Sequence, residues 1–500
     1  MGSKRRFLFV FLLFSLVAIA CRLSGATPVA WVGTPTAQSE EKTLTAQALS
    51  FTPTAKPATA TPSTQVPTSA AETATAQTSG PWLIFPSEDG LSLYSVDQNT
   101  NQMRIIDLPP LVNASDLVGG LAPDGSSLLV RAGRVEVPDE LAIYQLRSPE
   151  TPPAKITPLL GPALQNAIAE QKSKLAPYAL KAVTQPNGIS WRSDSQMAVF
   201  TAALQGSYGN LYTWQPASGQ IDRLTNRTQQ DFSPIWSHGG GEILFESSNT
   251  NSLPPVWQVD RVVGLYTNDR GMIYEMYAPP ADSLGEVFAS WDNNNRMLSY
   301  TQSAVGNRNL KLIIIRGGEP KVIWPGVFTE MAFDPTHNLA AVLLDSVAAS
   351  KLNKTAGVYF SSDNINQFHL AQIGDFQHLE YSDTKALFIA SGKNGTIVFG
   401  PDGVVLSLRL EERASYSPNG KWLVGWGQSG ARLYTGEGLY LQDLSDAPVE
   451  NLIWQNDSAG FFILTEEGLQ HYQFPLLQAT LISQDVARGH ENWFGWLGPR

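Results

Sequence analysis

The stretch Ala414-Ser-Tyr-Ser-Pro-Asn-Gly-Lys-Trp-Leu-Val-Gly-Trp-Gly427 contains the pattern that decides the fold of this chain. A short apolar segment ends at Tyr416, a polar Ser-Pro-Asn-Gly turn follows, and a second apolar segment begins at Trp422. Asn and Gly tolerate positive φ, and Pro presets φ, so this turn composition favours a sharp reversal of the chain. The stretch therefore predicts a β-hairpin.

The same pattern recurs along the chain, each time with an apolar or aromatic residue directly before a polar turn. We call these positions the anchor residues: Leu121, Trp191, Trp236, Trp291, Phe333, Tyr381, Tyr416 and Trp454. They lie about 35 to 70 residues apart, mostly near the roughly 40 to 50 residues of one four-stranded propeller blade. In the clearest unit, strand patterns at 190–191, 197–201, 210–214 and 220–225 follow in order. The repeat predicts an all-β fold, a single β-propeller of four-stranded blades.

The number of blades depends on how the two ends of the repeat region combine. Residues 82–108 supply three strand patterns without a preceding anchor, and the segment Asn492–Leu497 is expected to supply the fourth strand. Pairing the two ends closes the ring and removes exposed sheet edges. Eight anchors and this split unit make nine candidate blades, but residues 430–452 are too short to form complete separate blades. We favour eight blades and keep seven and nine open.

The motifs of the repeat resemble a known family. The turn Ser417-Pro-Asn-Gly420, the strand pair Leu211-Tyr212 and the closing Arg223-Leu-Thr225 are similar to the TolB-type, WD-repeat-like propellers of bacterial envelope proteins. The resemblance covers residues 81–500 and implies contacts with proteins through one face or the central channel. No functional residue of that family has a specific counterpart here.

The N-terminus has the features of an export signal. Residues 1–20 contain the basic start Lys4-Arg-Arg6 and an apolar core, Phe7–Ala20, that is shorter than the roughly 20 residues needed to span a bilayer. Val17-Ala-Ile-Ala-Cys21 resembles a bacterial lipoprotein box, although Ala18 stands where that family usually has Leu. We expect Cys21 to be lipidated and to anchor the protein to a membrane. The alternative is an ordinary secretion signal that ends near a cysteine.

Residues 21–80 form a linker of different composition. From Gly25 onward, Thr, Ala, Pro, Ser and Gln predominate, and large apolar residues are almost absent. Such a segment cannot form a core, so the sequence predicts a disordered stalk before the 81–500 propeller domain. An extended polyproline-like stalk of this length would reach on the order of 170 Å.

Composition and charge narrow the possible partners. Hydrophobic residues make up 43% of the chain, with 13 tryptophans, which suits one large globular core and an expected monomer. The formal net charge of −11 argues against a nucleic-acid partner, because phosphate binding needs clustered Lys and Arg. The single cysteine excludes internal disulfides and a Cys-based zinc site.

The search for catalytic motifs finds none. Gly425-Trp-Gly-Gln-Ser-Gly430 matches the letters of a dinucleotide-binding motif, but strand patterns surround it, and we interpret it as a hairpin turn. We therefore predict no catalytic residue, no cofactor and no enzymatic activity.

Three other groups of residues have both a functional and a structural interpretation. The histidines are His238, His337, His369, His378, His471 and His490. His238, His337 and His378 lie near equivalent blade positions, which a ring architecture brings together as for a metal site, but their spacing fits no ligand motif. We predict turn or surface histidines and no metal site, and ordinary turns in place of calcium loops at Asp292 and Asn456. The tryptophans at 191, 236, 291 and 454 suggest a surface on which a sugar ring could stack. Their repeat position fits packing in the core between blades better.

Two segments depart from the repeat. Residues 158–187 contain a helical pattern from about Ala163 to Lys174, and residues 249–286 contain two Pro-Pro pairs. Both are interpreted either as a binding rim on the propeller or as structural cover for apolar surface.

These observations together predict an extracytoplasmic, lipid-anchored propeller that binds a protein or another ligand at the cell envelope, with a protein or glycan partner. Its expected location is the outer face of the cytoplasmic membrane or the cell surface. The alternative function is a propeller enzyme, such as a lyase, lactonase or glycan hydrolase, with its site at the central channel. That alternative requires carboxylates or histidines that converge on one substrate position.

Overall fold

The computed structural model describes residues 80–248, 321–334, 337, 339–361, 367–393, 395–401, 412–489 and 493–498, and the strands at 261–313 and 405–408 by their backbone. The predicted signal peptide, Cys21 and the stalk lie outside the described residues. The chain divides into Met1–Ala74 and Thr75–Arg500, and the description below concerns the second unit.

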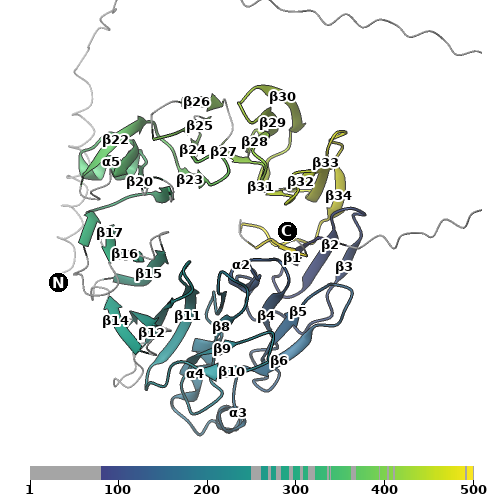
Figure 1. The fold of residues 1–500 in the computed structure, drawn as a ribbon, viewed down its shortest axis with the longest axis vertical. Helices are drawn as coiled ribbons and strands as arrows, with labels where there is room; N and C mark the ends of the chain where they lie inside the picture. Colours follow the sequence, from purple (N-terminus) through teal and green to yellow (C-terminus); the bar gives the residue numbers. More distant parts are fainter. Residues whose placement is uncertain are drawn as a thin grey trace, which may run out of the picture. The chain divides into compact units, whose positions relative to one another are not determined.

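The described residues form nine antiparallel sheets that follow one another along the chain (Figure 1). The first three sheets contain β35 (Gly495–Leu497), β1 (Trp82–Pro86), β2 (Leu93–Asp97) and β3 (Met103–Ile105); β4 (Leu128–Ala132), β5 (Ala142–Leu146) and β6 (Ala154–Pro158); and β7 (Ile189–Trp191), β8 (Ala198–Ala202), β9 (Asn210–Trp214) and β10 (Ile221–Arg223). The next three contain β11 (Gln230–Trp236), β12 (Glu242–Ser248), β13 (Arg261–Thr267) and β14 (Met272–Tyr277); β15 (Ser283–Trp291), β16 (Met297–Ser303), β17 (Arg308–Ile313) and β18 (Lys321–Trp324); and β19 (Glu330–Asp334), β20 (Leu339–Leu344), β21 (Gly357–Ser361) and β22 (Phe368–Ile373). The last three contain β23 (His378–Ser382), β24 (Leu387–Gly392), β25 (Gly395–Phe399) and β26 (Val405–Leu408); β27 (Arg413–Tyr416), β28 (Trp422–Gly427), β29 (Gly430–Thr435) and β30 (Tyr440–Ser445); and β31 (Val449–Trp454), β32 (Gly460–Thr465), β33 (Gly468–Gln473) and β34 (Thr480–Ser483).

The sheets are the blades of a β-propeller, so the predicted fold is confirmed. In Figure 1, the labelled first strands β11, β15, β23, β27 and β31 lie on the inner side of their blades, toward the centre of the ring. The count of nine blades is the upper end of the predicted range and exceeds the favoured eight by one. The second blade is one reason why the number of blades is hard to predict from the sequence. In this blade α2 (Asp116–Gly120) replaces the first strand, and Leu121 makes only an isolated bridge to Leu128.

The anchor residues end the first strands as predicted. Trp191, Trp236, Tyr416 and Trp454 are the last residues of β7, β11, β27 and β31. The turn after Tyr416 shows why the local sequence folds this way. The Ser417 hydroxyl donates to Asn419 Oδ1 at 2.9 Å, the same oxygen accepts from the Lys421 amide at 3.0 Å, and Gly420 adopts a φ of 66°.

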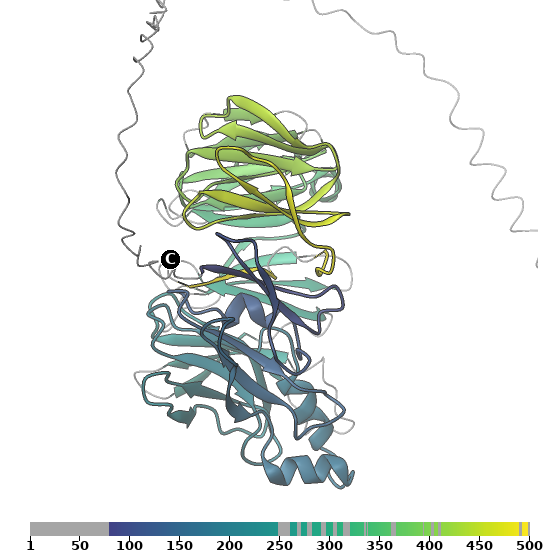
Figure 2. The same cartoon turned by 90° about the vertical axis from the view of Figure 1, so that its right-hand side faces the viewer.

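The ring closes by the pairing of its two ends, as the sequence predicted. β35 pairs antiparallel with β1 in the register Trp82↔Leu497 and Leu83↔Trp496. Figure 2 shows the purple N-terminal strands beside the yellow C-terminal ones. Across the same junction the Tyr94 hydroxyl donates to the Asp485 carboxylate, and this bond raises the pKa of Tyr94 to about 12.

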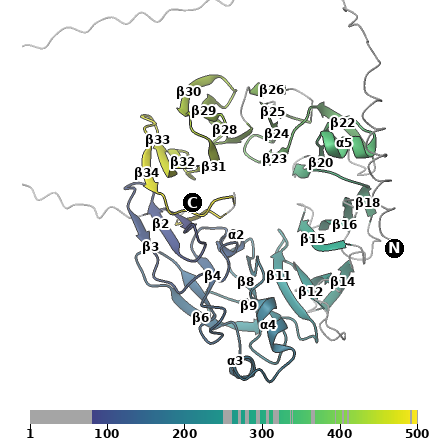
Figure 3. The same cartoon turned by 180° about the vertical axis from the view of Figure 1, so that it is seen from behind.

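The segment 158–187, for which one helix at about 163–174 was predicted, contains two shorter helices, α3 (Pro162–Ala169) and α4 (Ala176–Val183). Pro177 lies in the first turn of α4, where a missing N–H costs nothing, so it starts this helix and does not stop the previous one. Leu164, Ala179 and Val183 are buried in the core cluster that contains Trp191. α4 packs against β8 and β11 (Figure 3), α3 packs against α4, and the two helices cover apolar surface.

The second segment that departed from the repeat is largely part of a blade. β13 and β14 are the third and fourth strands of the fourth blade, and β15 begins the next one. The expectation of an insertion over 249–286 is therefore wrong for these strands. Twelve residues separate β12 from β13, and this connection hides the continuation of the blade in the sequence. Residues 249–260 lie outside the described residues. Within the described residues, α5 (Ser346–Leu352) is the remaining helix, and none is long and apolar enough to cross a membrane.

A buried ion pair ties the second blade to the chain that leaves α4. The Arg131 guanidinium binds both carboxylate oxygens of Asp116, at 2.7 and 2.6 Å, and donates to the carbonyls of Val183 and Gln185. Both side chains are fully buried. A Cβ at Gly188 would lie 2.2 Å from the guanidinium carbon, so only glycine fits there. The hydrogen bonds of this pair offset the desolvation cost of burying two charges. The bonds from Arg131 to the Val183 and Gln185 carbonyls also fix the position of the end of α4.

A buried histidine connects the ninth blade to the first. His471 on β33 is 2% exposed, and its Nδ1 lies 2.6 Å from Oδ1 of Asn101 in the turn between β2 and β3. Its Nε2 lies 2.9 Å from the Gln455 amide nitrogen, and its ring stacks on Phe462. These contacts fit a neutral imidazole, and burial lowers the pKa of His471 to about 4. The expectation of a turn or surface histidine is wrong at this position.

This burial predicts a pH dependence of stability. The unfolded chain protonates His471 near pH 6.5, but the folded chain keeps it neutral down to about pH 4, so stability is lost as the pH falls through this window. Between pH 7 and pH 4, the free energy of unfolding should fall by about 3 kcal/mol more in the natural protein than in His471→Gln. Urea unfolding at both pH values measures the difference, and equal falls in the two proteins would show that His471 titrates normally.

Candidate functional site

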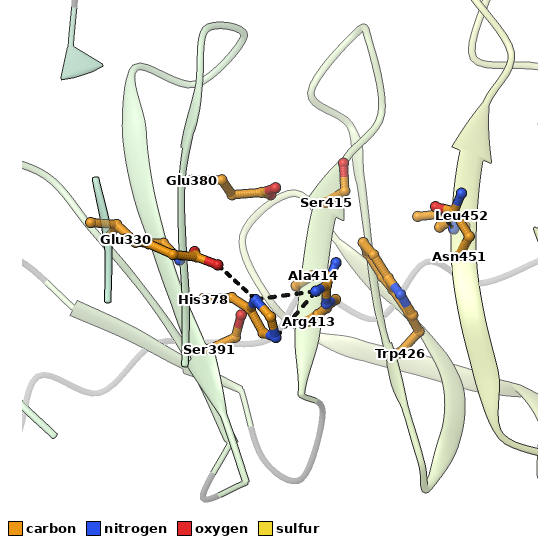
Figure 4. A pocket seen from close by; sticks show the side chains of 11 residues that line it. Glu330, His378, Glu380, Ser391, Arg413, Ala414, Ser415, Trp426, Asn451 and Leu452 are labelled. Atoms are coloured by element: carbon orange, nitrogen blue, oxygen red, sulfur yellow. Dashed lines mark hydrogen bonds and ion pairs between the residues drawn. The ribbon is translucent and has the colours of Figure 1, made fainter. Parts of the chain in front are cut away.

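A pocket of about 350 Å³ opens on the inner strands of the last four blades (Figure 4). It is lined by residues of β19, β23, β24, β27, β28 and β31: Glu330, His378, Leu379, Glu380, Ser391, Arg413, Ala414, Ser415, Trp426, Asn451 and Leu452. Most of these residues come from the first strands of their blades. The site is therefore built by the ring and not by an inserted loop.

Four lining residues occupy the same position of the repeat. Glu330, His378, Arg413 and Asn451 each lie three residues before the anchor of their blade. Radial repetition brings equivalent positions of neighbouring blades side by side, and here these four meet in one pocket. Residues of different chemistry thus occupy this position in the last four blades, whereas Gly188 and Ser233 occupy it in the third and fourth blades.

Glu330, His378 and Arg413 form a hydrogen-bonded row across three blades. One Glu330 carboxylate oxygen lies 3.1 Å from His378 Nδ1, and the other accepts from the Leu379 amide at 2.7 Å. The Arg413 guanidinium lies 3.1 Å from both ring nitrogens of His378. A neutral imidazole that donates from Nδ1 to Glu330 and accepts at Nε2 from Arg413 satisfies the whole row. Both Glu330 oxygens are thus engaged.

Glu380 differs from Glu330 in its surroundings. Its side chain is exposed to the pocket, and no hydrogen bond joins it to any of the residues that the structure describes. The surrounding protein removes much of the water that would hydrate its charge, and this desolvation raises the pKa of Glu380 to about 7. Arg413 and His378 oppose the rise in the pKa of Glu380, and Glu330 adds to it.

Trp426 supplies a second group without a partner. Its side chain lines the pocket from β28 and is 6% exposed, and its buried indole N–H has no acceptor within the described part of the chain. A buried donor left unpaired costs about 1–3 kcal/mol, so such a group is normally satisfied by water or by a ligand. The Glu380 carboxylate is therefore open to the pocket, whereas the Trp426 indole nitrogen is shielded from it, as are the indole nitrogens of Trp236 and Trp454.

The charges of the pocket do not balance. Glu330 and Glu380 are two carboxylates, and Arg413 is the single permanently charged cation among the lining residues. With His378 neutral, the ionised pocket has a formal charge of −1. A positively charged group is the complement that this site favours.

The residues proposed from the sequence as metal ligands lie in different environments. His238 and His337 are exposed, with His337 Nδ1 2.7 Å from Asp334, while His378 lines the pocket. His369 is exposed on β22, and His490 lies outside the described residues. In the described part of the chain, no three His, Cys, Asp or Glu side chains form a group suited to a metal ion.

The other sequence interpretations concern turns and core positions. Gly427 and Gly430 pair across a hairpin between β28 and β29, so the predicted turn at the glycine-rich motif is confirmed. Asn456 lies in the turn between β31 and β32, as predicted, and Asp292 lies outside the described residues. The anchor tryptophans Trp191, Trp236 and Trp454 are buried, which confirms core packing, and the side chain of Trp291 also lies outside the description.

Comparisons with known proteins identify the fold. No protein-family model and no curated protein matches this chain. A crystal structure of a eukaryotic initiation factor is 10% identical, with a TM-score of 0.51, over 84% of this chain and 99% of that one. TolB from Acinetobacter baumannii is 12% identical, with a TM-score of 0.32, and the match covers 57% of this chain and 61% of the length of TolB. Dipeptidyl peptidase 4 from Porphyromonas gingivalis is 10% identical, with a TM-score of 0.44, over 76% of this chain and 64% of that one.

Identities this low show a shared fold alone. TolB is among the similar structures, so the resemblance predicted from the blade motif is confirmed for the fold. The prediction that the chain is not an enzyme is corrected, because peptidases are also among the similar structures. The pocket itself brings together Glu330, His378 and Glu380, which are groups of the kind used in acid–base chemistry. The lack of a catalytic sequence motif therefore does not exclude an enzymatic role for this β-propeller.

Proposed function

We propose that this chain is an exported, lipid-anchored β-propeller that binds a ligand or a protein partner at the cell envelope through the pocket on its inner strands. The observation that carries the proposal is the pocket itself. Side chains at one repeat position in four successive blades converge there, next to the exposed carboxylate of Glu380. Polar side chains gathered in a concave site on a rigid frame are typical of ligand binding.

The N-terminal sequence supports the location. The basic start and apolar core of residues 1–20 have the features of an export signal, and Cys21 ends a lipoprotein-like box. Acyl chains on Cys21 would hold the protein at the membrane at about 0.8 kcal/mol per buried CH₂ group. The Thr/Pro/Ala-rich segment up to Gly80 would then separate the propeller from the membrane surface. We therefore expect the propeller to lie at the outer face of the cytoplasmic membrane or at the cell surface.

A second candidate function is acid–base catalysis in the same pocket. Glu330 is held by His378 and by the Leu379 amide, whereas Glu380 has no hydrogen bond within the described residues. Two carboxyl groups in different environments are the arrangement in which one serves as an acid and the other as a base. Conversion of a bound compound by the natural protein, lost in both Glu330→Gln and Glu380→Gln, would support this function.

The anchor is tested by replacing the proposed lipid attachment site. Cys21→Ser should move the protein from the membrane fraction to the soluble extracytoplasmic fraction, because no thiol remains to be acylated. Cell fractionation with immunoblotting measures the distribution, and Ser24→Ala serves as the matched control. Full membrane retention of Cys21→Ser would contradict lipid anchoring.

Binding through the pocket is tested by filling it. Ser415→Tyr places a large side chain among the lining residues, whereas Ser218→Tyr adds the same group to an exposed turn of the third blade. The full-length protein and both variants are incubated with envelope extract, re-isolated, and analysed by mass spectrometry for bound compounds and proteins. We expect a set retained by the natural protein and Ser218→Tyr but not by folded Ser415→Tyr. Identical sets from all three proteins would contradict the proposed function.

A further inference from the structure

Exposed apolar side chains gather on the outer hairpins of the eighth, ninth and first blades, which are neighbours in the ring (Figure 1). Half of the exposed large apolar side chains in the described part of the chain lie there: Leu439, Tyr440, Leu441, Leu476, Leu481, Met103 and Ile105. Leu439 is 68% exposed in the turn 436–439 between β29 and β30, and Leu476 is 78% exposed in the turn 474–479 between β33 and β34. We call these two turns the hairpin tips. We propose that the hairpin tips bind the surface of a lipid membrane.

The two hairpin tips lie side by side on one face of the propeller. The Trp422 ring stacks on Phe474 of the second tip at a centroid distance of 4.9 Å, and Trp422 pairs with Thr435 at the base of the first tip. The strands of a blade are antiparallel in sequence order, so its third turn lies on the same side as its first. Both tips therefore lie on the face that contains the turns after the anchor residues, which we call the anchor-turn face.

The chain enters the propeller on the same face, next to the tips. Gly80 precedes β1, and its amide and carbonyl bond to side chains of the turn between β2 and β3. In that turn, Gln98 Nε2 lies 3.4 Å from Asp457 Oδ2 of the ninth blade. Two residues after Asp457, the Ala459 carbonyl accepts from the Phe474 amide of the second tip. The segment that follows Cys21 thus joins the propeller on the face that bears the protruding leucines.

The chemistry of the tips favours lipid over a protein partner. The sequence from Gly468 to Gln484 contains no charged residue, although 16% of the chain is charged. The first tip contains Glu437, but the exposed Lys421 lies beside it, since its carbonyl accepts from the Gly436 amide at 2.6 Å. The tips therefore add little repulsion from an anionic surface, despite the net charge of the chain. Protruding leucines enter a fluid lipid layer without a preformed partner surface, whereas a folded protein would need a matching pocket for each.

Docking through this face leaves the candidate site open. Glu330, His378 and Arg413 are the first residues of β19, β23 and β27, whereas the anchor turns follow the last residues of such strands. The pocket therefore lies toward the opposite end of the inner strands. A propeller that touches a membrane with its anchor-turn face would turn the pocket away from that membrane.

The contact is expected to be weak and reversible. Two leucines bury little apolar surface, and even one long acyl chain gives only marginal membrane binding. The tips would therefore orient an anchored propeller and would not replace the anchor. Release of Cys21→Ser into the soluble fraction remains the expected result of cell fractionation. The inference rests on the proposed function only for the membrane that the protein meets.

The experiment measures vesicle binding at equilibrium. It uses residues 21–500 with Cys21→Ser, which retain the whole second unit but neither the apolar export signal nor an acylation site. Vesicles of phosphatidylethanolamine and phosphatidylglycerol with a dansyl-labelled lipid are added, and energy transfer from the tryptophans of the protein to the dansyl group is recorded. We expect a saturable rise in energy transfer.

Three variants separate apolar insertion from other effects. Leu439→Ser combined with Leu476→Ser should weaken vesicle binding at least about ten-fold, because a hydroxymethyl group gains little in lipid. Leu91→Ser is the matched control: Leu91 is 47% exposed in the turn between β1 and β2, on the opposite face, and its loss should change nothing. Lys421→Gln should weaken binding less than the double variant. Unfolding curves confirm that the variants are folded.

Each contrary outcome overturns the inference. The lipid proposal is wrong if no energy transfer occurs, if the double variant binds like its parent, or if Leu91→Ser loses as much binding. Binding lost in Lys421→Gln but kept in the double variant would show adhesion through charge alone. A protein from the envelope extract that is lost in the double variant, without vesicle binding, would assign the tips to a protein partner. The anchor and the pocket are tested on Cys21 and Ser415, so those proposals fail separately.

Discussion

The antiparallel pairing of β35 with β1 is the interaction on which the rest of the structure depends. A propeller without this contact would leave one side of β1 unpaired, with its backbone groups exposed as an open sheet edge. Side chains reinforce the junction from several directions. The Trp496 indole donates to the Trp454 carbonyl at 2.8 Å, Tyr94 binds Asp485, and His471 meets Asn101 in the first blade. The closed ring then fixes the relative positions of blades that are far apart in the sequence.

Closure also explains how a repeat of packing residues produces a polar site. Each first strand contributes an anchor to the core between blades, and the residue three positions earlier lies near the start of that strand. In blades six to nine these earlier positions are Glu330, His378, Arg413 and Asn451, whereas Gly188 and Ser233 stand there in the third and fourth blades. The site therefore occupies one sector of the ring, where charged and hydrogen-bonding residues replace small ones.

The sequence predicted the architecture because turn chemistry and strand periodicity are local signals. The hairpin around Ser417, the anchor positions and the pairing of the two ends follow from residues close together in the chain or from the need to close a ring. The count of blades was harder, because α2 replaces the first strand before Leu121 and twelve residues separate β12 from β13. The helix expected to stop before Pro177 is shorter, and that proline begins the next helix instead.

The candidate site was missed for a different reason. His238 and His337 lie in the polar turns after the anchors, and in the sequence His378 looks like a third scattered histidine. Aligning the anchors and then looking three residues upstream would have placed His378 between Glu330 and Arg413. The unpaired indole of Trp426 and the desolvation of Glu380 could not be predicted from sequence, since both depend on which side chains surround them in the ring.

Amide hydrogen exchange of residues 82–86 tests the closed ring most directly. We would compare the full-length chain with a chain that lacks residues 493–500, using mass spectrometry of the peptide that contains β1. The closed ring predicts strong protection of the amides of β1 that face β35 in the full-length chain and fast exchange of the same amides in the truncated chain. Equal exchange in the two chains would contradict the closed ring and, with it, the alignment of blades that forms the pocket.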